Sequence, residues 1–245
     1  FRLLLGETGV VELREDDSNS VGRKWRAALS QLGFLVPCLR RTPFAQMQHE
    51  IGEPDTISPN GRRLLDSKGN IPAMQDCFAR AMASYVIPSP IESTYDCQPF
   101  RPLLLILNSM LKVEEEFGES AVSFLEFATI IQLATGEQPA DAVVADIRRC
   151  RQDRRQAASA RQFNRQAYEH AGTLHGYQAG TFRDYADLNI RYLKATGLLQ
   201  AKGRGIEIAP SKRCLVEELV RQAPPIPSGI EYLKVLCEGC RLPTD

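Results

Sequence analysis

Residues 182–220 read FRDYADLNIRYLKATGLLQAKGRGIEIAPSKRCLVEELV and carry the most informative secondary-structure pattern in the chain. The first half of this stretch predicts a helix, because the following residues recur at helical spacing as one buried stripe: Phe182, Tyr185, Ala186, Asn189 and Leu193. The segment 181–184, Thr-Phe-Arg-Asp, resembles a capping box that opens this helix, and Gly197 ends it. Four charged residues share the other face: Arg183, Asp187, Arg191 and Lys194.

The second half of this stretch predicts a β-hairpin followed by another helix. Residues 198–202 and 206–209 form two short strands, and Gly203-Arg204-Gly205 joins them in a tight, basic turn. A helix over 211–221 follows. This order of elements is that of a winged helix, which usually holds one helix and a basic hairpin against a nucleic-acid duplex. Many winged helices are instead dimerisation or protein-docking modules, so the fold alone does not settle the function.

A similar order of elements precedes it in residues 21–65. Polar residues 17–20 cap a predicted helix that ends at Gly33, and its buried stripe is Val21, Trp25, Ala28, Leu29 and Leu32. A strand at 34–36, a polar insertion over 37–55 and a second strand at Ile57 come next. Ser58 then caps a helix that has Pro59 at its first position.

The middle of the chain predicts helices with short links. An apolar helix begins at Pro102, Ser123 and Glu126 form a capping box, and Pro139 starts a third helix. The seam of this third helix consists of Ala140, Val143, Val144, Ile147 and Cys150. Beyond the seam the helix runs into an arginine cluster, so its far end should project from the core. Residues 156–180 form a polar stretch without a predicted element.

These patterns predict a mainly α protein with small β-hairpins, arranged as tandem winged-helix or helix-turn-helix units. The expected domains are a first winged-helix-like unit (1–97), a helical unit (98–160) and a winged helix (161–222). Residues 223–245 are expected to form a linker, rich in proline over 224–229, and the start of a downstream domain.

The net charge of zero conceals strong segregation of charge along the chain. Residues 148–165 contain seven arginines and one carboxylate, Asp153, and residues 23–68 contain eight basic and four acidic residues. Phosphate attraction depends on local potential, so both segments are candidates for nucleic-acid contact. A solvated helix face is the alternative for the arginine run, although such a face normally alternates its charges.

The predicted DNA contacts are long basic side chains, which suit phosphate oxygens and, for arginine, guanine. They are Arg23, Lys24, Arg26, Arg62, Arg63, Arg148, Arg149, Arg151, Arg154, Arg155, Arg183, Arg191, Lys194, Lys202, Arg204 and Lys212.

Other functions find little support in the sequence. No apolar run approaches the roughly 18 residues of a membrane span, and seven scattered cysteines are typical of reduced thiols in a cytoplasmic protein. Cys237 and Cys240 lack a second ligand pair for zinc. Pro54-Asp55 is not followed by the acidic-x-lysine strand of a metal-dependent nuclease, and no catalytic motif appears elsewhere. We therefore expect this chain to carry no cofactor and no catalytic site.

The sequence resembles a known family in several segments that occur in the same order. They are 21–35, 57–65, 102–107, 141–155, and above all RDYADxxxRYxxxTGL at 183–198 with IAPSK at 208–212. These segments resemble the N-terminal DNA-recognition region of AlwI-type restriction endonucleases, which are type IIS enzymes, and of related nicking endonucleases. The insertion at 37–55 and the lack of a catalytic domain depart from that family's pattern.

The resemblance implies a target-recognition part that binds double-stranded DNA at a short asymmetric site as a monomer. It implies a separate C-terminal nuclease domain that uses Mg²⁺ and lies beyond Asp245, and a second nuclease subunit is a further partner that cleavage could require. Phe1 is not an initiator methionine, which fits a chain cut from a longer one. The alternatives are a dimeric winged-helix transcriptional regulator that binds a palindrome and a pure protein-interaction scaffold.

Overall fold

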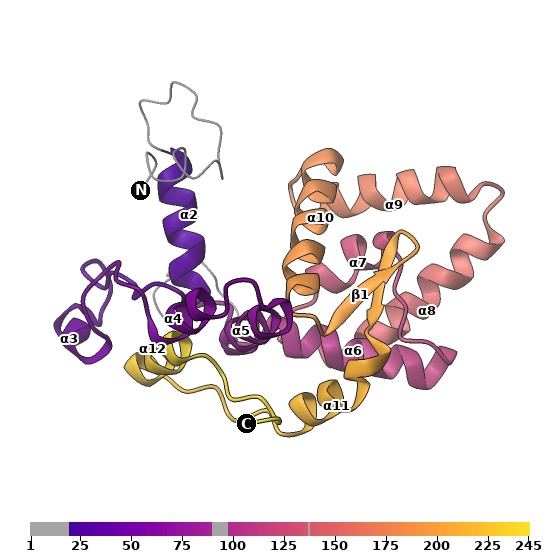
Figure 1. Cartoon of the computed structure of the whole chain (residues 1–245). Coiled ribbons are helices and arrows are strands. Elements are labelled where there is room, and N and C mark those ends of the chain that lie inside the picture. The colour runs from indigo at the N-terminus through magenta and orange to yellow at the C-terminus, as the bar shows by residue number, and fades with distance from the viewer. Residues whose placement is uncertain (1–19, 90–97, 137) are drawn as a thin grey trace. The chain divides into compact units, whose positions relative to one another are not determined.

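The computed structural model describes residues 20–89, 98–136 and 138–245 (Figure 1). As expected, the described chain is mainly helical, with eleven α-helices and one small antiparallel hairpin. It divides into two compact units. Among the described residues, unit 1 contains those up to Tyr85, Ser89 and 227–240, and unit 2 contains 86–88, 98–226 and 241–245. Each unit is described by itself below.

Unit 1 is a cluster of helices that the chain enters twice. Its helices are α2 (Ser20–Gln31), α3 (Gln48–Ile51), α4 (Pro59–Asp66), α5 (Ile71–Ser84) and α12 (Gly229–Glu238). Helix α12 packs on α3, α4 and α5. Gly33 has a positive φ of 69°, and a Cβ there would lie 2.0 Å from the Leu236 carbonyl oxygen, so only glycine allows this approach.

Local signals in unit 1 are partly confirmed. The Ser58 hydroxyl accepts a hydrogen bond from the Gly61 amide at 2.9 Å, and Pro59 is the first residue of α4. The two predicted strands are reduced to a single bridge between Leu35 and Ile57. Trp25, predicted to be buried, is 42% exposed, whereas Leu29 and Leu32 pack against the core around Phe34. The predicted cap at 17–19 and the Val21 side chain lie outside the residues described.

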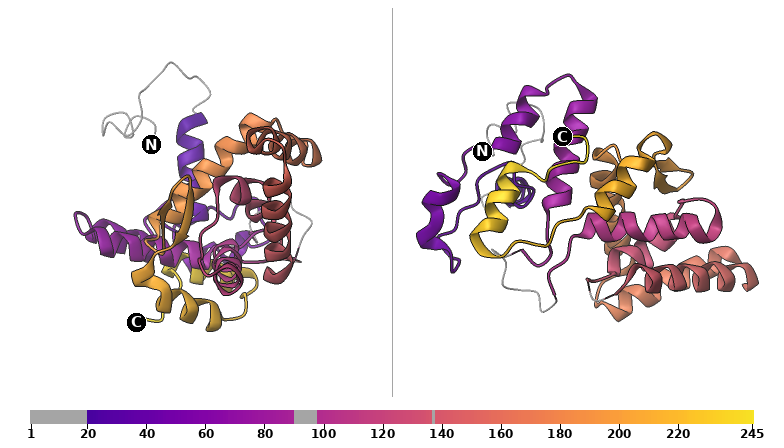
Figure 2. Two further views of the ribbon diagram at one scale, coloured as in Figure 1. Left: turned by 90° about the vertical axis from the view of Figure 1, so that its right-hand side faces the viewer. Right: turned by 90° about the horizontal axis from the view of Figure 1, so that it is seen from below.

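Unit 2 surrounds the hairpin with helices (Figures 1 and 2). Its helices are α6 (Pro102–Phe117), α7 (Phe124–Thr129), α8 (Ala140–Gln156), α9 (Ala160–Leu174), α10 (Ala179–Ala195) and α11 (Arg213–Arg221). Strands β1 (Leu199–Lys202) and β2 (Gly205–Ile208) pair in the register Leu199↔Ile208. Val122 bridges Ile206 on the other edge of β2. A Cβ on Gly205 would lie 1.9 Å from the Val122 carbonyl oxygen, so this close approach also requires glycine.

Several predictions for unit 2 are confirmed. The Ser123 amide donates to Glu126 Oε2 at 2.7 Å and the Glu126 amide donates to Ser123 Oγ at 3.3 Å, which is the predicted capping box. Ala140, Val143, Val144 and Ile147 are buried along α8 as expected. The hairpin lies within a residue of its predicted position.

Two helices of unit 2 differ from the prediction. The polar stretch 156–180 contains helix α9, whose cap is Ser159. Helix α10 begins at Ala179, with Gln178 rather than Thr181 at the cap position. Its buried stripe is consequently rotated: Ile190 is buried, whereas Tyr185 and Asn189 are exposed. The predicted capping box at 181–184 is wrong, because Thr181 already lies within the first turn.

The compact units differ from the domain ranges expected from the sequence. Ranges 98–160 and 161–222 share unit 2. Helix α12 packs in unit 1 through Tyr232, Leu233 and Leu236, which are fully or almost fully buried. Among the described residues, no helix is both long enough and apolar enough to cross a bilayer.

Candidate nucleic-acid interface

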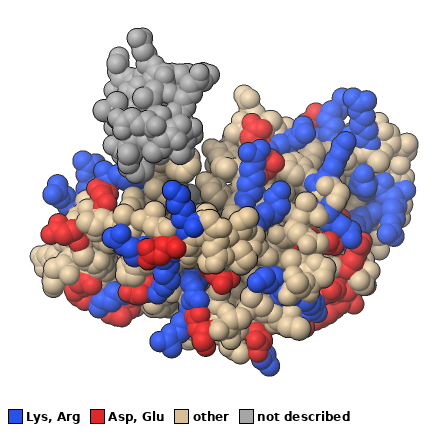
Figure 3. Space-filling model, viewed as in Figure 1, with Lys and Arg blue, Asp and Glu red and all other residues tan. Residues whose placement is uncertain are grey.

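An open cleft of about 490 Å³ in unit 2 brings together predicted DNA contacts from two elements far apart in the sequence. Arg151, Arg154 and Arg155 come from α8, and Lys202 and Arg204 come from the hairpin. In the space-filling view, Lys and Arg side chains gather over this part of unit 2, with a few acidic side chains beside them at its upper edge and more lower on the same face (Figure 3). The fold therefore concentrates positive charge that the sequence separates by some fifty residues.

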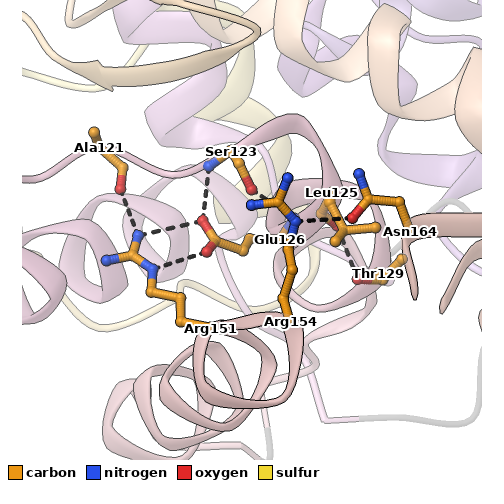
Figure 4. A network of polar contacts seen from close by, with 8 residues as sticks. All are labelled: Ala121, Ser123, Leu125, Glu126, Thr129, Arg151, Arg154 and Asn164. Atoms are coloured by element: carbon orange, nitrogen blue, oxygen red, sulfur yellow. Dashed lines mark hydrogen bonds and ion pairs between the residues drawn. The ribbon is translucent and has the colours of Figure 1, made fainter. Parts of the chain in front are cut away.

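Three arginines at the cleft form no ion pair with any described residue, although Glu119 also lines the cleft. Arg155 and Arg204 are exposed and form no ion pair with any described residue. Arg154 donates from Nε to the side-chain oxygen of Asn164 at 2.9 Å (Figure 4), and this amide is neutral. Exposed guanidinium groups held near a concave surface suit phosphate oxygens, because they can donate several hydrogen bonds in one plane.

Arg151 differs from the prediction of a phosphate contact. Its Nε donates to Glu126 Oε1 at 2.8 Å and its Nη2 donates to the Ala121 carbonyl at 2.8 Å (Figure 4). The side chains of Arg151 and Glu126 are only 18% and 8% exposed, and the guanidinium lies 4.4 Å from the centre of the Phe117 ring. This arginine therefore fixes α8 to the capping box of α7 and is not free to bind a ligand.

Other predicted contacts in this region pair with carboxylates at the surface. Lys202 lies 3.1 Å from Glu207, and the pKa of Glu207 is lowered by hydrogen bonds from Gln200 and Lys202. Arg148 pairs with Glu116 through two hydrogen bonds, which lower the pKa of that carboxyl group. Only 15% of the Glu207 side chain and 26% of the Glu116 side chain are exposed, and both pairs reduce the local positive charge.

The cations of α10 face different neighbours. Arg183 lies over the Tyr168 ring of α9, 5.2 Å from its centre, whereas Arg191 pairs with Asp187 at 2.6 Å. Lys194 is half-buried and has no ion pair within the described chain. The cations that were predicted to share one face of α10 are therefore not equivalent. Arg183 packs on an aromatic ring, and Arg191 forms an ion pair.

Unit 1 carries its own basic surface. Arg23 and Arg26 line a second cleft of about 360 Å³, where Arg26 lies 2.7 Å from Asp55. Arg63 lies 3.5 Å from Glu238.

The remaining predicted contacts, which belong to both units and lie outside the two clefts, are exposed or half-buried: Lys24, Arg62, Arg149 and Lys212.

Two features were missing from the predicted interface. Arg161 and Arg165 of α9 are exposed, and neither is among the predicted DNA contacts, although the charge count of residues 148–165 includes both. Tyr185, Leu188 and Tyr192 form an exposed apolar stripe on α10, with exposed fractions of 54%, 43% and 37%. If Ile190 is assigned to the core, the buried face of α10 no longer includes Tyr185. The three apolar residues of the stripe then lie together on the exposed face.

In residues 20–89, 98–136 and 138–245, no three His, Cys, Asp or Glu side chains come together in a group that could hold a metal ion. Cys237 is buried at the end of α12, where burial raises the pKa of its thiol to about 12. A protonated, buried thiol is a poor metal ligand.

A mainly helical protein with a basic cleft between an arginine-rich helix and a hairpin has the features typical of nucleic-acid-binding proteins. The sequence model of the family described as AlwI restriction endonuclease matches residues 30–245, and the chain belongs to this family. The family fits the role of a type II restriction enzyme and implies DNA as a partner. No curated protein matches the chain.

Proposed function

We propose that unit 2 binds double-stranded DNA at a short asymmetric sequence, as the target-recognition part of a type IIS restriction or nicking endonuclease. The observation that carries this proposal is the basic cleft, in which Arg154 and Arg155 of α8 meet Arg204 of the hairpin. Membership of the restriction endonuclease family makes DNA the natural occupant. Guanidinium groups from two elements would contact successive phosphates and fix the register of the protein on the duplex.

A winged-helix arrangement is our proposal for unit 2. The order α6, Val122, α7, α10, β1 and β2 follows that of a winged helix, with α8 and α9 inserted between its second and third helices. In support, Val122 bridges β2 as a first short strand would, and α10 packs on both α7 and β1. Helix α10 would then be the recognition helix, and the turn at Arg204 would be the wing.

Base reading would fall to α10 and the wing. Arginine donates bidentately to guanine in the major groove, and Arg191 is the exposed candidate on α10. Its partner Asp187 would have to yield, which an exposed pair does at little cost. DNA cleavage is proposed for a separate Mg²⁺-dependent domain, and the protein is proposed to act in the cytoplasm.

Binding to duplexes of random sequence, followed by selection of the preferred one, tests the proposal. We expect fluorescence anisotropy to detect binding that falls about 10³- to 10⁵-fold between 50 and 200 mM salt, if six to ten phosphates are contacted. Arg204→Ala should weaken binding at least tenfold. Arg221→Ala on α11 is the matched control, because Arg221 is exposed and lies outside the cleft. Binding that is insensitive to salt would overturn the proposal.

A dimeric transcriptional regulator is the alternative, and the exposed stripe of Tyr185, Leu188 and Tyr192 favours it. An apolar stripe on one helix could pair with its copy in a symmetric dimer. Light scattering of the complex with the selected duplex separates the two functions. One chain on an asymmetric sequence supports the restriction role, and two chains on a palindrome support the regulator.

A further inference from the structure

Helices α8 and α9, which are inserted between α7 and α10, form a helical hairpin. The end of this helical hairpin that contains the turn does not pack in the core of unit 2. The first half of α8 is buried through Val143, Val144 and Ile147, whereas residues 152–156 are exposed. Residues 158–162 at the start of α9 are exposed as well. Figures 1 and 2 show the turn between the two helices at the far end of unit 2.

Basic side chains from three helices, α8, α9 and α10, lie along one face of α9. Arg161, Asn164, Arg165 and Tyr168 lie at i, i+3, i+4 and i+7, so their side chains share a face. Asn164 holds Arg154 of α8, and Tyr168 lies beneath Arg183 of α10. We call these four arginines the α9 strip: Arg154, Arg161, Arg165 and Arg183. The strip leads from the outer end of the hairpin to α10.

The strip is poorly neutralised by the protein itself. Arg161 has no ion pair with any described residue, and Arg165 lies 3.7 Å from Glu169 with its side chain 72% exposed. Arg161 also lies in the first turn of α9, where no acidic residue is present. A positive charge is unfavourable there, because the helix dipole places its positive end at the N-terminus. The fold gains nothing from Arg161 in this position.

The chemistry of the strip fits a phosphate backbone better than a protein surface. Seven residues of helix span about 10 Å at 1.5 Å per residue, which matches the rise of about three base pairs at 3.4 Å each. Residues 152–162, at the outer end of the strip, include no large apolar side chain, and the aromatic side chain within the strip, Tyr168, already packs beneath Arg183. Protein interfaces depend on aromatic or aliphatic anchors that the partner buries. The outer end of the strip offers no such anchor, and its arginines suit repeated anionic groups.

We propose that the α9 strip binds the phosphates of one DNA strand beside the bases that α10 and the wing read. This inference rests on the proposed function and adds a contact that is independent of base sequence. The contact lengthens the DNA footprint on one side of the recognised sequence. It also gives the inserted hairpin a role in affinity that is separate from specificity.

The test compares Arg161→Gln/Arg165→Gln with the wild-type chain on the selected duplex and on a scrambled duplex of equal length. We expect the affinity for both duplexes to fall by the same factor, about tenfold or more at low salt. The slope of log K against log salt should become shallower by about 2, close to 0.9 for each lost phosphate contact. The preference for the selected sequence should stay unchanged.

The matched control is Arg221→Gln, set against the single variant Arg165→Gln. Arg221 resembles Arg165, since it lies 3.4 Å from Glu218 and its side chain is 71% exposed. Each of these two variants removes one charge, so the control should keep the wild-type slope, whereas Arg165→Gln should make the slope shallower by about 1. Hydroxyl-radical footprinting gives a second readout, in which protection on one flank should vanish only in the α9 variant.

Three outcomes decide the matter. An unchanged slope and footprint in the α9 variant would overturn the inference while leaving the proposed function intact. A loss of preference for the selected sequence would also overturn it, because the strip would then read bases. Failure of the wild-type chain to bind any duplex would instead remove the proposed function on which the inference rests.

Discussion

Arg151 and Arg154 lie three positions apart on α8, yet the structure gives them opposite roles. Arg151 is held by Glu126 and the Ala121 carbonyl, while Arg154 donates to the neutral side chain of Asn164 (Figure 4). A count of charge along the sequence treats both as free. Such a count cannot distinguish the two arginines, because the carboxylate that neutralises Arg151 lies 25 residues away in the sequence. Electrostatic surfaces depend on such distant partners, which local patterns do not reveal.

We predict that Glu126→Ala is strongly destabilising. It leaves the largely buried guanidinium of Arg151 without its carboxylate partner and also removes the capping box of α7, so the free energy of unfolding should fall by about 3–5 kcal/mol. Urea denaturation measures this loss. Glu116→Ala breaks the more exposed pair with Arg148 and should cost less than about 1 kcal/mol. Equal losses for the two variants would contradict this assignment.

We predict that Gly205→Ala loosens the hairpin. The added Cβ would meet the Val122 carbonyl oxygen, which also accepts a hydrogen bond from the Ile206 amide at 3.0 Å. Thermal unfolding should report a loss of about 1–3 kcal/mol or more, since backbone must move. Gly203→Asn is the control, because nothing lies within 4 Å of a Cβ there and asparagine tolerates the positive φ. A comparable loss in both variants would show that the clash is not the cause.

At the scale of whole elements, the sequence predicts best where a signal is local. The capping box at Ser123 and the glycine-arginine turn of the hairpin both act within four residues, and both are found as predicted. Helix α9 was missed because its apolar residues are few and half-buried, as Phe163 and Tyr168 illustrate. The rotation of α10 was missed because tyrosine at 185 fits an apolar stripe by type. Only tertiary packing selects Ile190 instead.

The start of α10 can be tested directly. Gln178 has extended backbone at the cap position and makes no capping hydrogen bond from its side chain. Gln178→Asp should therefore stabilise unit 2 by about 0.5–2 kcal/mol, as a new N-cap does. Thr181→Ala should change stability by less than about 0.5 kcal/mol, since an exposed residue inside the helix caps nothing. Chemical denaturation that ranks these variants the other way would restore Thr181 as the cap.

For the whole molecule, the most consequential finding is that unit 1 is not continuous in sequence. The proline-rich segment 224–229 was recognised as a link, but α12 beyond it completes unit 1. An apolar stripe predicts that a helix is buried and says nothing about which helices bury it. The partners of α12 lie more than a hundred residues earlier in the chain, and no local pattern connects them.

We predict that Leu236→Ala weakens unit 1 selectively. Leu236 is fully buried, and its loss should cost about 2–5 kcal/mol through lost burial and a cavity. Hydrogen-exchange mass spectrometry should find faster exchange in α4 and α5, with α6 and α8 unchanged. Faster exchange throughout both units would mean that they unfold as one cooperative body.

The late position of α12 has a consequence for how the protein is made on the ribosome. Helix α5 ends at Ser84 and α12 begins at Gly229, so translation at about 5–20 residues per second separates them by several seconds to tens of seconds. During that interval the apolar residues of unit 1 that α12 covers in the folded protein are exposed on the nascent chain. Unit 1 therefore stays incomplete until residues 98–226 of unit 2 have been synthesised, and its exposed apolar residues are open to chaperones during that time.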